Sequence, residues 1–401
     1  MKNKTKVYLD YAATTPVDKE VLTVMLPYFE KKFGNASEIH SWGTEAKVAI
    51  EEARRNVAKA LGAGEKEVIF TSCATESINL SHKGLIEGIV KGERLGKPHI
   101  ITTQIEHKAV IETCKHLEKL GRAEVTYLPV DKDGLVSVSA VEKAIRAETV
   151  LVSVMFVNNE VGTIEPIEEI GRLIKKINQL RITNSQLPIY FHTDATQAIG
   201  YLDCDVNKLG VDLLSLTGHK IYAPKGVGAL YVRRGTPIAR QQDGGGQEFG
   251  LRAGTENVPY LVALGKAVEQ TTEGKQQSTE GIGRLRDKLI EGVLQIPGTK
   301  LTGHPTKRAP HIASFIIEGV EGEALLLLLN EYGIAASTGS ACTTGDLQPS
   351  HVLTAMGYKP QESHGSLRFS LGKDTTEEEI DYVLEVLPKI IEKLRGMAPR
   401  I

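Results

Sequence analysis

The chain has 401 residues, of which 41% are hydrophobic and 24% are charged, and its formal net charge is −2. This composition is ordinary for a globular protein, and the length exceeds what one hydrophobic core usually holds, so we expect two domains. The balanced charge gives no general attraction to nucleic acid or to acidic membranes, and we expect the protein to bind neither. The longest apolar run, residues 324–329, is far too short to span a bilayer.

The amino end and the cysteines predict a cytoplasmic protein. The first residues, MKNKTKVYLD, are basic but lack the apolar stretch of a signal peptide. The cysteines at positions 73, 114, 204 and 342 lie far apart and form no CxxC pair. Dispersed cysteines of this kind are typical of thiols in a reducing compartment.

Strand-like apolar runs alternate with helical patterns between residues 67 and 232. Strands are predicted at 67–71, 99–103, 124–128, 150–154, 187–192, 211–216 and 228–232, and an amphipathic helix is predicted at 74–90. Alternation of this kind predicts an α/β fold with a mostly parallel sheet between layers of helices. In such a sheet, ligands bind at the carboxyl ends of the strands.

The pattern changes after about residue 260. Helices are predicted at 285–294 and 323–332, strands at 312–317 and 366–371, and a last helix after Thr375 and Thr376. We therefore expect a large domain, residues 21–260, followed by a smaller α+β C-terminal domain, residues 261–401. The N-terminal segment, residues 1–20, is expected to pack with the small domain.

An acidic residue and a lysine follow two of the predicted strands. Asp194 comes just after strand 187–192, and Lys220 comes after strand 211–216, before a glycine-rich turn. Pyridoxal phosphate needs a lysine that forms a Schiff base and a carboxylate that pairs with the pyridinium nitrogen. Taken singly, Asp194 suits a turn and Lys220 suits the surface, but the pair favours the cofactor. His192 and Asp194 could also be metal ligands, but no third ligand is evident, so we expect no metal.

Two further segments suit the same cofactor. Thr71–Glu76, TSCATE, lies between a predicted strand and a predicted helix, and backbone N–H groups at a helix N-terminus bind phosphate well. The same residues also suit a plain helix cap at Ser72. His107 follows another predicted strand. A histidine there can stack on an aromatic ring and move protons, because imidazole titrates near neutrality, or it can cap a helix.

Together these segments resemble the cysteine desulfurases of the NifS/IscS type, in the class-V aminotransferase family of fold-type I pyridoxal-phosphate enzymes. The match runs nearly end to end, through YLDYAATTPVD, FGNASEIHSWG, TSCATES, EHKAV, VNNEVGTI, HTDATQAIG, TGHKIYAPKGVGALY, LRAGTEN, STGSACTTG and SLRFSLG. The resemblance implies the fold-type I transferase fold and pyridoxal 5'-phosphate as cofactor. It also implies conversion of L-cysteine to L-alanine with transfer of the sulfur.

The resemblance implies roles for several residues around the cofactor ring. Lys220 corresponds to the Schiff-base lysine, and Asp194 to the partner of the pyridinium nitrogen. Gln197 occupies the position near the phenolic oxygen. His107 occupies the position of the residue that stacks on the ring and moves protons.

Contacts to the cofactor phosphate and to the substrate are implied in the same way. The phosphate contacts correspond to Ala74, Thr75, Thr217, His219 and Thr255. Because the last of these reaches across a subunit interface in the family, the resemblance implies a homodimer with shared active sites. Asn159 and Arg368 occupy the positions that hold the substrate carboxylate, a task that suits the planar guanidinium group.

Cys342 distinguishes the reaction among enzymes that share the lysine and the aspartate. It lies in Ser337–Gly345, STGSACTTG, whose polar and glycine-rich residues do not suit a core, although a lone cysteine is more often buried. A thiol that takes up sulfur must reach the substrate and then an acceptor, and it must be a thiolate. We expect Cys342 to form a persulfide and to be catalytic together with Lys220 and His107. One thiol allows at most a transient iron–sulfur ligand.

The stretch that follows Cys342, from Gly345 to His351, is long and resembles the NifS/IscS group rather than the short-loop SufS group. The resemblance therefore implies sulfur delivery to an acceptor protein, such as an iron–sulfur scaffold or a thiolation enzyme. The alternatives are a selenocysteine lyase, another aminotransferase-like enzyme with the same cofactor, and a non-catalytic scaffold.

Overall fold

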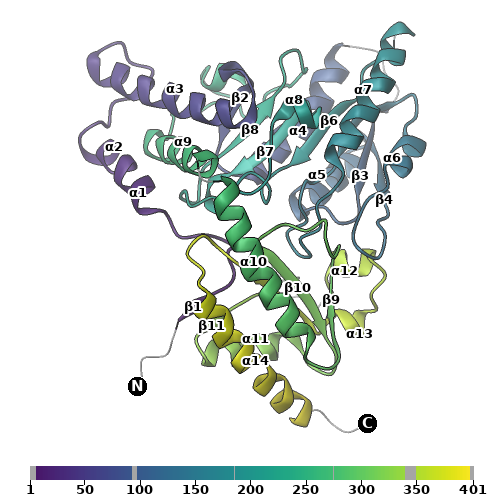
Figure 1. Ribbon diagram of the computed structural model, residues 1–401. Coiled ribbons are helices and arrows are strands. Elements are labelled where there is room, and N and C mark those ends of the chain that lie inside the picture. The colour runs from purple at the N-terminus through teal and green to yellow at the C-terminus, as the bar shows by residue number, and fades with distance from the viewer. Residues whose placement is uncertain (1–5, 93–96, 185, 274, 339–348, 398–401) are drawn as a thin grey trace.

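The computed structural model describes residues 6–92, 97–184, 186–273, 275–338 and 349–397. Within those ranges no helix combines the length and the apolar character needed to cross a membrane. Figure 1 shows a large sheet flanked by helices, with a smaller group of helices and strands below it that contains most of the C-terminal part of the chain.

The described residues form a central sheet of seven strands in the order β2-β8-β7-β6-β5-β3-β4. Its strands are β2 (Val68–Thr71), β3 (His99–Thr103), β4 (Glu124–Leu128), β5 (Thr149–Ser153), β6 (Tyr190–Asp194), β7 (Leu213–Thr217) and β8 (Gly228–Val232). The strands from β7 to β4 run parallel to one another, whereas β8 is antiparallel to β2 and β7. The predicted α/β fold with a mostly parallel sheet is therefore confirmed.

One strand beside the site differs from its prediction at both ends. The strand predicted at 187–192 is observed at Tyr190–Asp194. It begins later because Pro188 has no backbone N–H with which to join the ladder. It ends later because its pairing with β7 continues through Asp194. Asp194 is thus the last residue of a strand and not a turn residue.

The inner strands of the central sheet are buried on both faces. In β8, Ala229 and Tyr231 belong to one apolar core, and Leu230 and Val232 belong to the core on the opposite face. The first core is covered by α1 (Lys19–Met25), α3 (Ser41–Leu61), α6 (Val138–Ala144), α7 (Ile167–Thr183), α8 (Val206–Leu209) and α9 (Val258–Glu273), and the second by α4 (Ala74–Gly92) and α5 (Lys108–Lys119). Burial on both faces explains the near-continuous apolar runs in the sequence.

The C-terminal part builds a separate antiparallel sheet in the order β12-β10-β9. Its elements are β9 (Thr299–Leu301), β10 (Ile312–Ile317) and β12 (Ser366–Ser370), with the helices α10 (Lys275–Leu294), α11 (Gly322–Glu331), α12 (His351–Ala355), α13 (Pro360–Ser363) and α14 (Glu377–Met397). Helix α10 begins earlier than predicted. Its first turns, with the sequence KQQSTEG, have no apolar periodicity, so the pattern did not indicate a helix there.

The N-terminal segment joins this second part of the molecule. Strand β1 (Val7–Tyr8) pairs in parallel with β11 (Ile334–Ala335). Val7 and Leu9 are buried in the apolar cluster formed with α10, α11 and α14, whereas α9 belongs to a core of the central sheet. We therefore propose that the small domain consists of the segment before α1 and the chain from α10 onward, so that the boundary follows α9.

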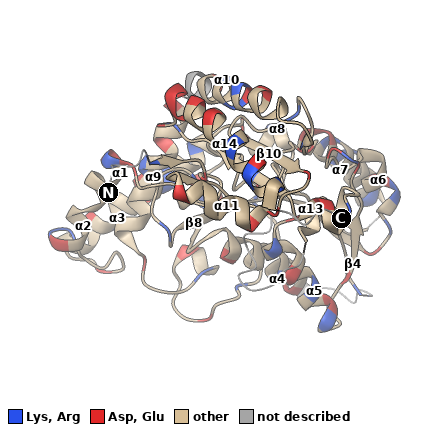
Figure 2. Ribbon diagram, turned by 90° about the horizontal axis from the view of Figure 1, so that it is seen from below, with Lys and Arg blue, Asp and Glu red and all other residues tan. Residues whose placement is uncertain are grey.

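Acidic and basic residues are interspersed along the outer helices of the small domain, as Figure 2 shows for α10 and α14. Lys288 of α10 forms ion pairs with Glu377 at 2.7 Å and with Asp381 at 2.5 Å on α14. Because these carboxylates are well exposed, each pair contributes little to stability. The helices are held together mainly by the buried side chains between them, such as Leu289 and Val383.

Candidate active site

A cavity of about 280 Å³ lies where the carboxyl ends of β6 and β7 meet the N-terminus of α4 and the strand β12. The predicted site residues that line it are Ala74, Thr75, His107, Asn159, Asp194, Gln197, Thr217, His219, Lys220 and Arg368. Thr255 is exposed and does not belong to this lining. Cys342 lies outside the described residues.

Lys220 is placed by a tight turn after β7. It ends the short 3-10 helix η2 (Gly218–Lys220), and a Cβ atom at Gly218 would come within 2.8 Å of the Val227 side chain. Glycine is therefore needed where this turn begins. The Lys220 Nζ donates hydrogen bonds to the carbonyls of Ala12 at 2.6 Å and Ala13 at 2.5 Å. The N-terminal segment thus holds the amine at the edge of the cavity.

Asp194 presents a buried carboxylate to the cavity. It ends β6, is 6% exposed, and its Oδ1 accepts a hydrogen bond of 2.9 Å from the Thr196 N–H. Gln197 follows in the same turn, and its Nε2 donates to the Ala12 carbonyl at 3.0 Å. The Ala12 carbonyl therefore receives both the Lys220 amine and the Gln197 amide.

His107 caps the helix that follows β3. It is the N-cap of α5, and its Nδ1 accepts a hydrogen bond of 3.1 Å from the Ala109 N–H. Burial lowers the pKa of His107, the charges of Lys220 and Lys108 lower it further, and the charge of Asp194 opposes them. The neutral imidazole must carry its proton on Nε2, because Nδ1 accepts. His107 therefore caps the helix, which is one of the two roles that the sequence left open, and its Nε2–H is still able to donate a hydrogen bond.

The N-terminus of α4 forms the end of the cavity that suits a phosphate. Ala74 and Thr75 begin the helix and line the cavity, and N–H groups in a first helical turn have no partner within the helix. The Ser72 hydroxyl donates to the Cys73 sulfur at 3.7 Å, and Glu76 accepts from the Ser72 N–H at 2.7 Å. Helix α4 begins at Ala74, so the residue directly before it is Cys73 and not Ser72, the cap that the sequence also allowed.

Two residues from the β7 turn lie beside this helix end. Thr217 lines the cavity, and its hydroxyl donates to the Val227 carbonyl at 3.2 Å. The Nδ1 of His219 lies 3.3 Å from the Thr14 hydroxyl. Burial, together with the positive charges of Lys220 and Lys225, lowers the pKa of His219 to about 4. The ring is therefore neutral at pH 7.

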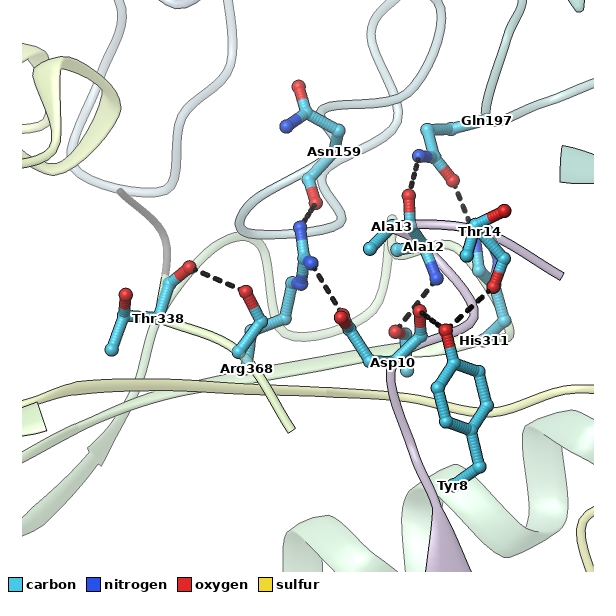
Figure 3. A network of polar contacts seen from close by, with 12 residues as sticks. Tyr8, Asp10, Ala12, Ala13, Thr14, Asn159, Gln197, His311, Thr338 and Arg368 are labelled. Atoms are coloured by element: carbon cyan, nitrogen blue, oxygen red, sulfur yellow. Dashed lines mark hydrogen bonds and ion pairs between the residues drawn. The ribbon is translucent and has the colours of Figure 1, made fainter. Parts of the chain in front are cut away.

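Arg368 brings a guanidinium group from the small domain to the cavity (Figure 3). It lies in β12, is 5% exposed, and donates to the Asn159 carbonyl at 2.7 Å and to Asp10 Oδ1 at 2.8 Å. Its Nε is buried without a hydrogen-bond partner among the described residues. A buried guanidinium with spare N–H groups is suited to a carboxylate ligand. Asn159 holds this arginine through its backbone.

The sequence did not point to Asp10, Ala12 or Ala13 as site residues. They belong to the motif YLDYAATTPVD, which is part of the resemblance but assigns these residues no role. The apolar lining formed by Met155 and Val157 was also missed, because buried apolar residues carry no chemical signal in a sequence.

These residues fit pyridoxal phosphate. The cavity combines a lysine amine, a buried carboxylate, a neutral imidazole and a helix N-terminus, which are the groups that this cofactor needs for its aldehyde, its pyridinium nitrogen, its ring face and its phosphate. Arg368 also lines the cavity, and its guanidinium group is suited to bind the carboxylate of an amino-acid substrate.

Comparison with known proteins finds relatives that match nearly the whole chain. The cysteine desulfurase IscS of Methanosarcina thermophila is 54% identical over 393 residues, which cover 98% of this chain and 94% of that protein. A solved NifS-like protein is 41% identical with a TM-score of 0.89, over 97% of this chain and 100% of the other. The structure of SspA in complex with cysteine is 39% identical with a TM-score of 0.77, over 93% and 100%.

The family match covers almost the whole chain, since residues 7–383 match aminotransferase class V. It includes both the central sheet with Asp194 and Lys220 and the small domain with Arg368. The chain therefore belongs to the class-V aminotransferase family of fold-type I pyridoxal-phosphate enzymes.

Proposed function

We propose that this protein is a cysteine desulfurase, which converts L-cysteine to L-alanine and passes the sulfur to an acceptor. The observation that carries the proposal is the meeting of Lys220, Asp194 and Arg368 in one cavity. The relative with 54% identity is named cysteine desulfurase, and the structural neighbour with 39% identity is a complex with cysteine.

Four groups of this chain are proposed to hold the cofactor. Pyridoxal phosphate, when bound, draws electrons from an amino-acid substrate and weakens the bonds at its Cα and Cβ. Asp194 pairs with the pyridinium nitrogen, and the first turn of α4 holds the phosphate. Lys220 attaches the cofactor covalently, and His107 lies against the ring.

Arg368 is proposed to orient the substrate. The guanidinium is buried and held by Asn159 and Asp10, so its direction is set before substrate arrives. Binding of the substrate carboxylate there fixes the amino group near the Lys220 side of the cavity. Such fixed orientation contributes to the rate by removing the entropy cost of alignment from the chemical step.

Lys220 and His107 are proposed to move protons. The Lys220 amine is held by two carbonyls, and the neutral His107 carries its proton on Nε2. Positioned acid and base groups of this kind each contribute roughly 10²–10⁴ in rate. Burial favours the neutral form of His107, and its Nδ1 is occupied by the Ala109 N–H, so its proposed part is to donate from Nε2, whereas the Lys220 amine is the group that accepts a proton.

Cys342 is proposed as the residue that takes the sulfur. Its thiolate attacks the sulfur of bound L-cysteine, so that an S–S bond forms and the substrate C–S bond breaks. The electron pair of the broken bond stays with the substrate, which takes up protons and leaves as L-alanine. Cys342 retains the sulfur as a persulfide and passes it to an acceptor protein, such as an iron–sulfur scaffold or a thiolation enzyme.

The active form is proposed to be a homodimer. Thr255, the residue expected to reach the partner's phosphate site, is exposed. Large apolar side chains are exposed in and between α1 and α3, namely Leu22, Leu26, Phe29, Phe33, Ile39, Trp42 and Val48. An apolar surface of this kind is typical of a protein interface. We also propose a cytoplasmic location, on the dispersed cysteines of the sequence.

The proposal is tested by the products formed from L-cysteine. The purified protein loaded with pyridoxal phosphate is incubated with L-cysteine, and L-alanine and protein-bound sulfur are measured in the same sample. Equal amounts of the two are expected. A keto acid in place of alanine, or turnover restricted to L-selenocysteine, would contradict the proposal.

A further inference from the structure

A buried histidine of the small domain contacts a proposed cofactor ligand of the central sheet. His311 directly precedes β10, is 1% exposed, and has its Nε2 3.1 Å from the Gln197 Oε1. Figure 3 shows the Gln197 amide in contact with both Ala12 and His311. No motif of the sequence analysis included His311.

Two neighbours determine how the Gln197 amide is turned. The Ala12 carbonyl can only accept a hydrogen bond, and it lies 3.0 Å from the Gln197 nitrogen. The amide oxygen therefore faces His311, and because this oxygen can only accept, the His311 Nε2 must carry a proton. If the amide were reversed, its oxygen would lie against the Ala12 carbonyl oxygen, and no hydrogen bond could form between them.

The surroundings of His311 keep it neutral and fixed. Burial, followed by the positive charges of Arg368, Arg286 and Lys220, lowers the pKa of His311 to about 3. The ring is stacked on Tyr201, with the centroids 3.9 Å apart and the planes inclined by 10°. A neutral imidazole has one N–H, so Nδ1 is left bare, and it has no hydrogen-bond partner among the described residues.

We propose that His311 is a positioning residue that fixes the Gln197 amide with its NH₂ group toward the cavity. One N–H of this group binds the Ala12 carbonyl, and Gln197 lines the cavity, so the second N–H is available to a bound oxygen. The inference rests on the proposed pyridoxal phosphate site, where this oxygen is the phenolic oxygen of the cofactor. A donor to the deprotonated oxygen stabilises it and lowers the pKa of the bound cofactor.

The test replaces His311 and follows the colour of the bound cofactor with pH. His311→Phe keeps a ring on Tyr201 but removes the N–H donor. The pH midpoint of the visible absorption of bound pyridoxal phosphate is expected to rise by about half to one pKa unit, because one hydrogen bond to a charged atom loses its orientation. His311→Gln, whose amide again donates, is expected to return the midpoint toward the wild-type value.

Matched variants separate positioning from simple destabilisation. Ile312→Val changes the next buried residue, and it is expected to lower the melting temperature without moving the midpoint. Gln197→Ala is expected to raise the midpoint alone, and adding His311→Phe should then have no further effect. A wild-type midpoint in His311→Phe, or an equal shift in both backgrounds, would overturn the inference.

A second measurement does not depend on the cofactor or on a variant that folds. Nitrogen-15 spectra of the wild-type protein labelled at histidine distinguish the two imidazole nitrogens, and His311 is expected to carry its proton on Nε2. Protonation of Nδ1 would show that the inference is wrong. Failure of the wild-type protein to bind pyridoxal phosphate would instead contradict the proposed function, so the two failures are distinguishable.

Discussion

Arg368 and Asp10 form a hydrogen-bonded ion pair of 2.8 Å although they lie 358 positions apart in the chain. The arginine comes from β12, and the aspartate follows β1. The carbonyls of Ala12 and Ala13, a few residues further on, hold the Lys220 amine. The N-terminal segment thus connects the two cationic side chains of the site.

Asp10→Ala is expected to lower the free energy of unfolding by about 3 kcal/mol, because it leaves a buried guanidinium without its counter-charge. The Arg368 side chain is 6% exposed and that of Asp10 is 20% exposed. Urea unfolding measures the loss. In an Arg368→Met background, the same aspartate substitution is expected to cost less than about 1 kcal/mol. Equal costs in both backgrounds would show that the ion pair is not the cause.

Lys220→Ala is expected to lose covalent attachment of pyridoxal phosphate, because Lys220 is the lysine among the described residues that line the cavity. Borohydride reduction followed by peptide mass spectrometry measures the attachment. Lys225→Ala, which removes an exposed lysine nearby, serves as the control and is expected to keep the adduct. An adduct that persists in Lys220→Ala would assign the attachment to another residue.

Cys342→Ser is expected to keep the visible absorption of the cofactor but to form no persulfide from L-cysteine. Alanine production should fall by at least about 10²-fold, because a serine hydroxyl is a poor nucleophile toward sulfur. A persulfide label and an alanine assay on the same sample measure both effects. Cys204→Ala, at a buried position in the core of the central sheet, is the control and should still form the persulfide. Normal sulfur release by Cys342→Ser would exclude the proposed role.

Glu106 is expected to make stability depend on pH. It is 0% exposed, its Oε1 accepts from the Thr103 hydroxyl at 2.7 Å and from the Met155 N–H at 3.0 Å, and burial raises its pKa to about 8 from 4.5. A carboxyl whose pKa is raised on folding stabilises the protein at low pH. This contribution falls between about pH 4.5 and pH 8, by about 1.4 kcal/mol per pH unit.

Glu106→Gln removes this titration. The difference in the free energy of unfolding between the wild-type protein and Glu106→Gln is therefore expected to shift in favour of the variant as the pH rises from 5 to 8. Glu112→Gln alters a side chain that is 63% exposed and should leave the pH profile unchanged. Parallel pH profiles for the wild-type protein and Glu106→Gln would show that Glu106 is ionised in the folded protein.

Much of the central sheet was predictable because most of its strands are buried on both faces. The strands at 99–103 and 228–232 are buried throughout and are observed with the predicted ends. The edge strand at 124–128 is partly exposed, and its ends also agree with the prediction. The ends of β6 were predicted less well, since they depend on pairing with β7 and on Pro188. The start of α10 was missed because polar helical turns have no apolar periodicity.

The sequence by itself predicted the chemistry of the site, through the positions of Asp194 and Lys220 after two predicted strands and, for Arg368, through the resemblance to cysteine desulfurases. The tertiary structure decided what holds these groups in place. Contacts such as those of Asp10 with Arg368 and of His311 with Gln197 join distant parts of the chain. They depend on how the small domain packs against the central sheet, and no local pattern in the sequence specifies that packing.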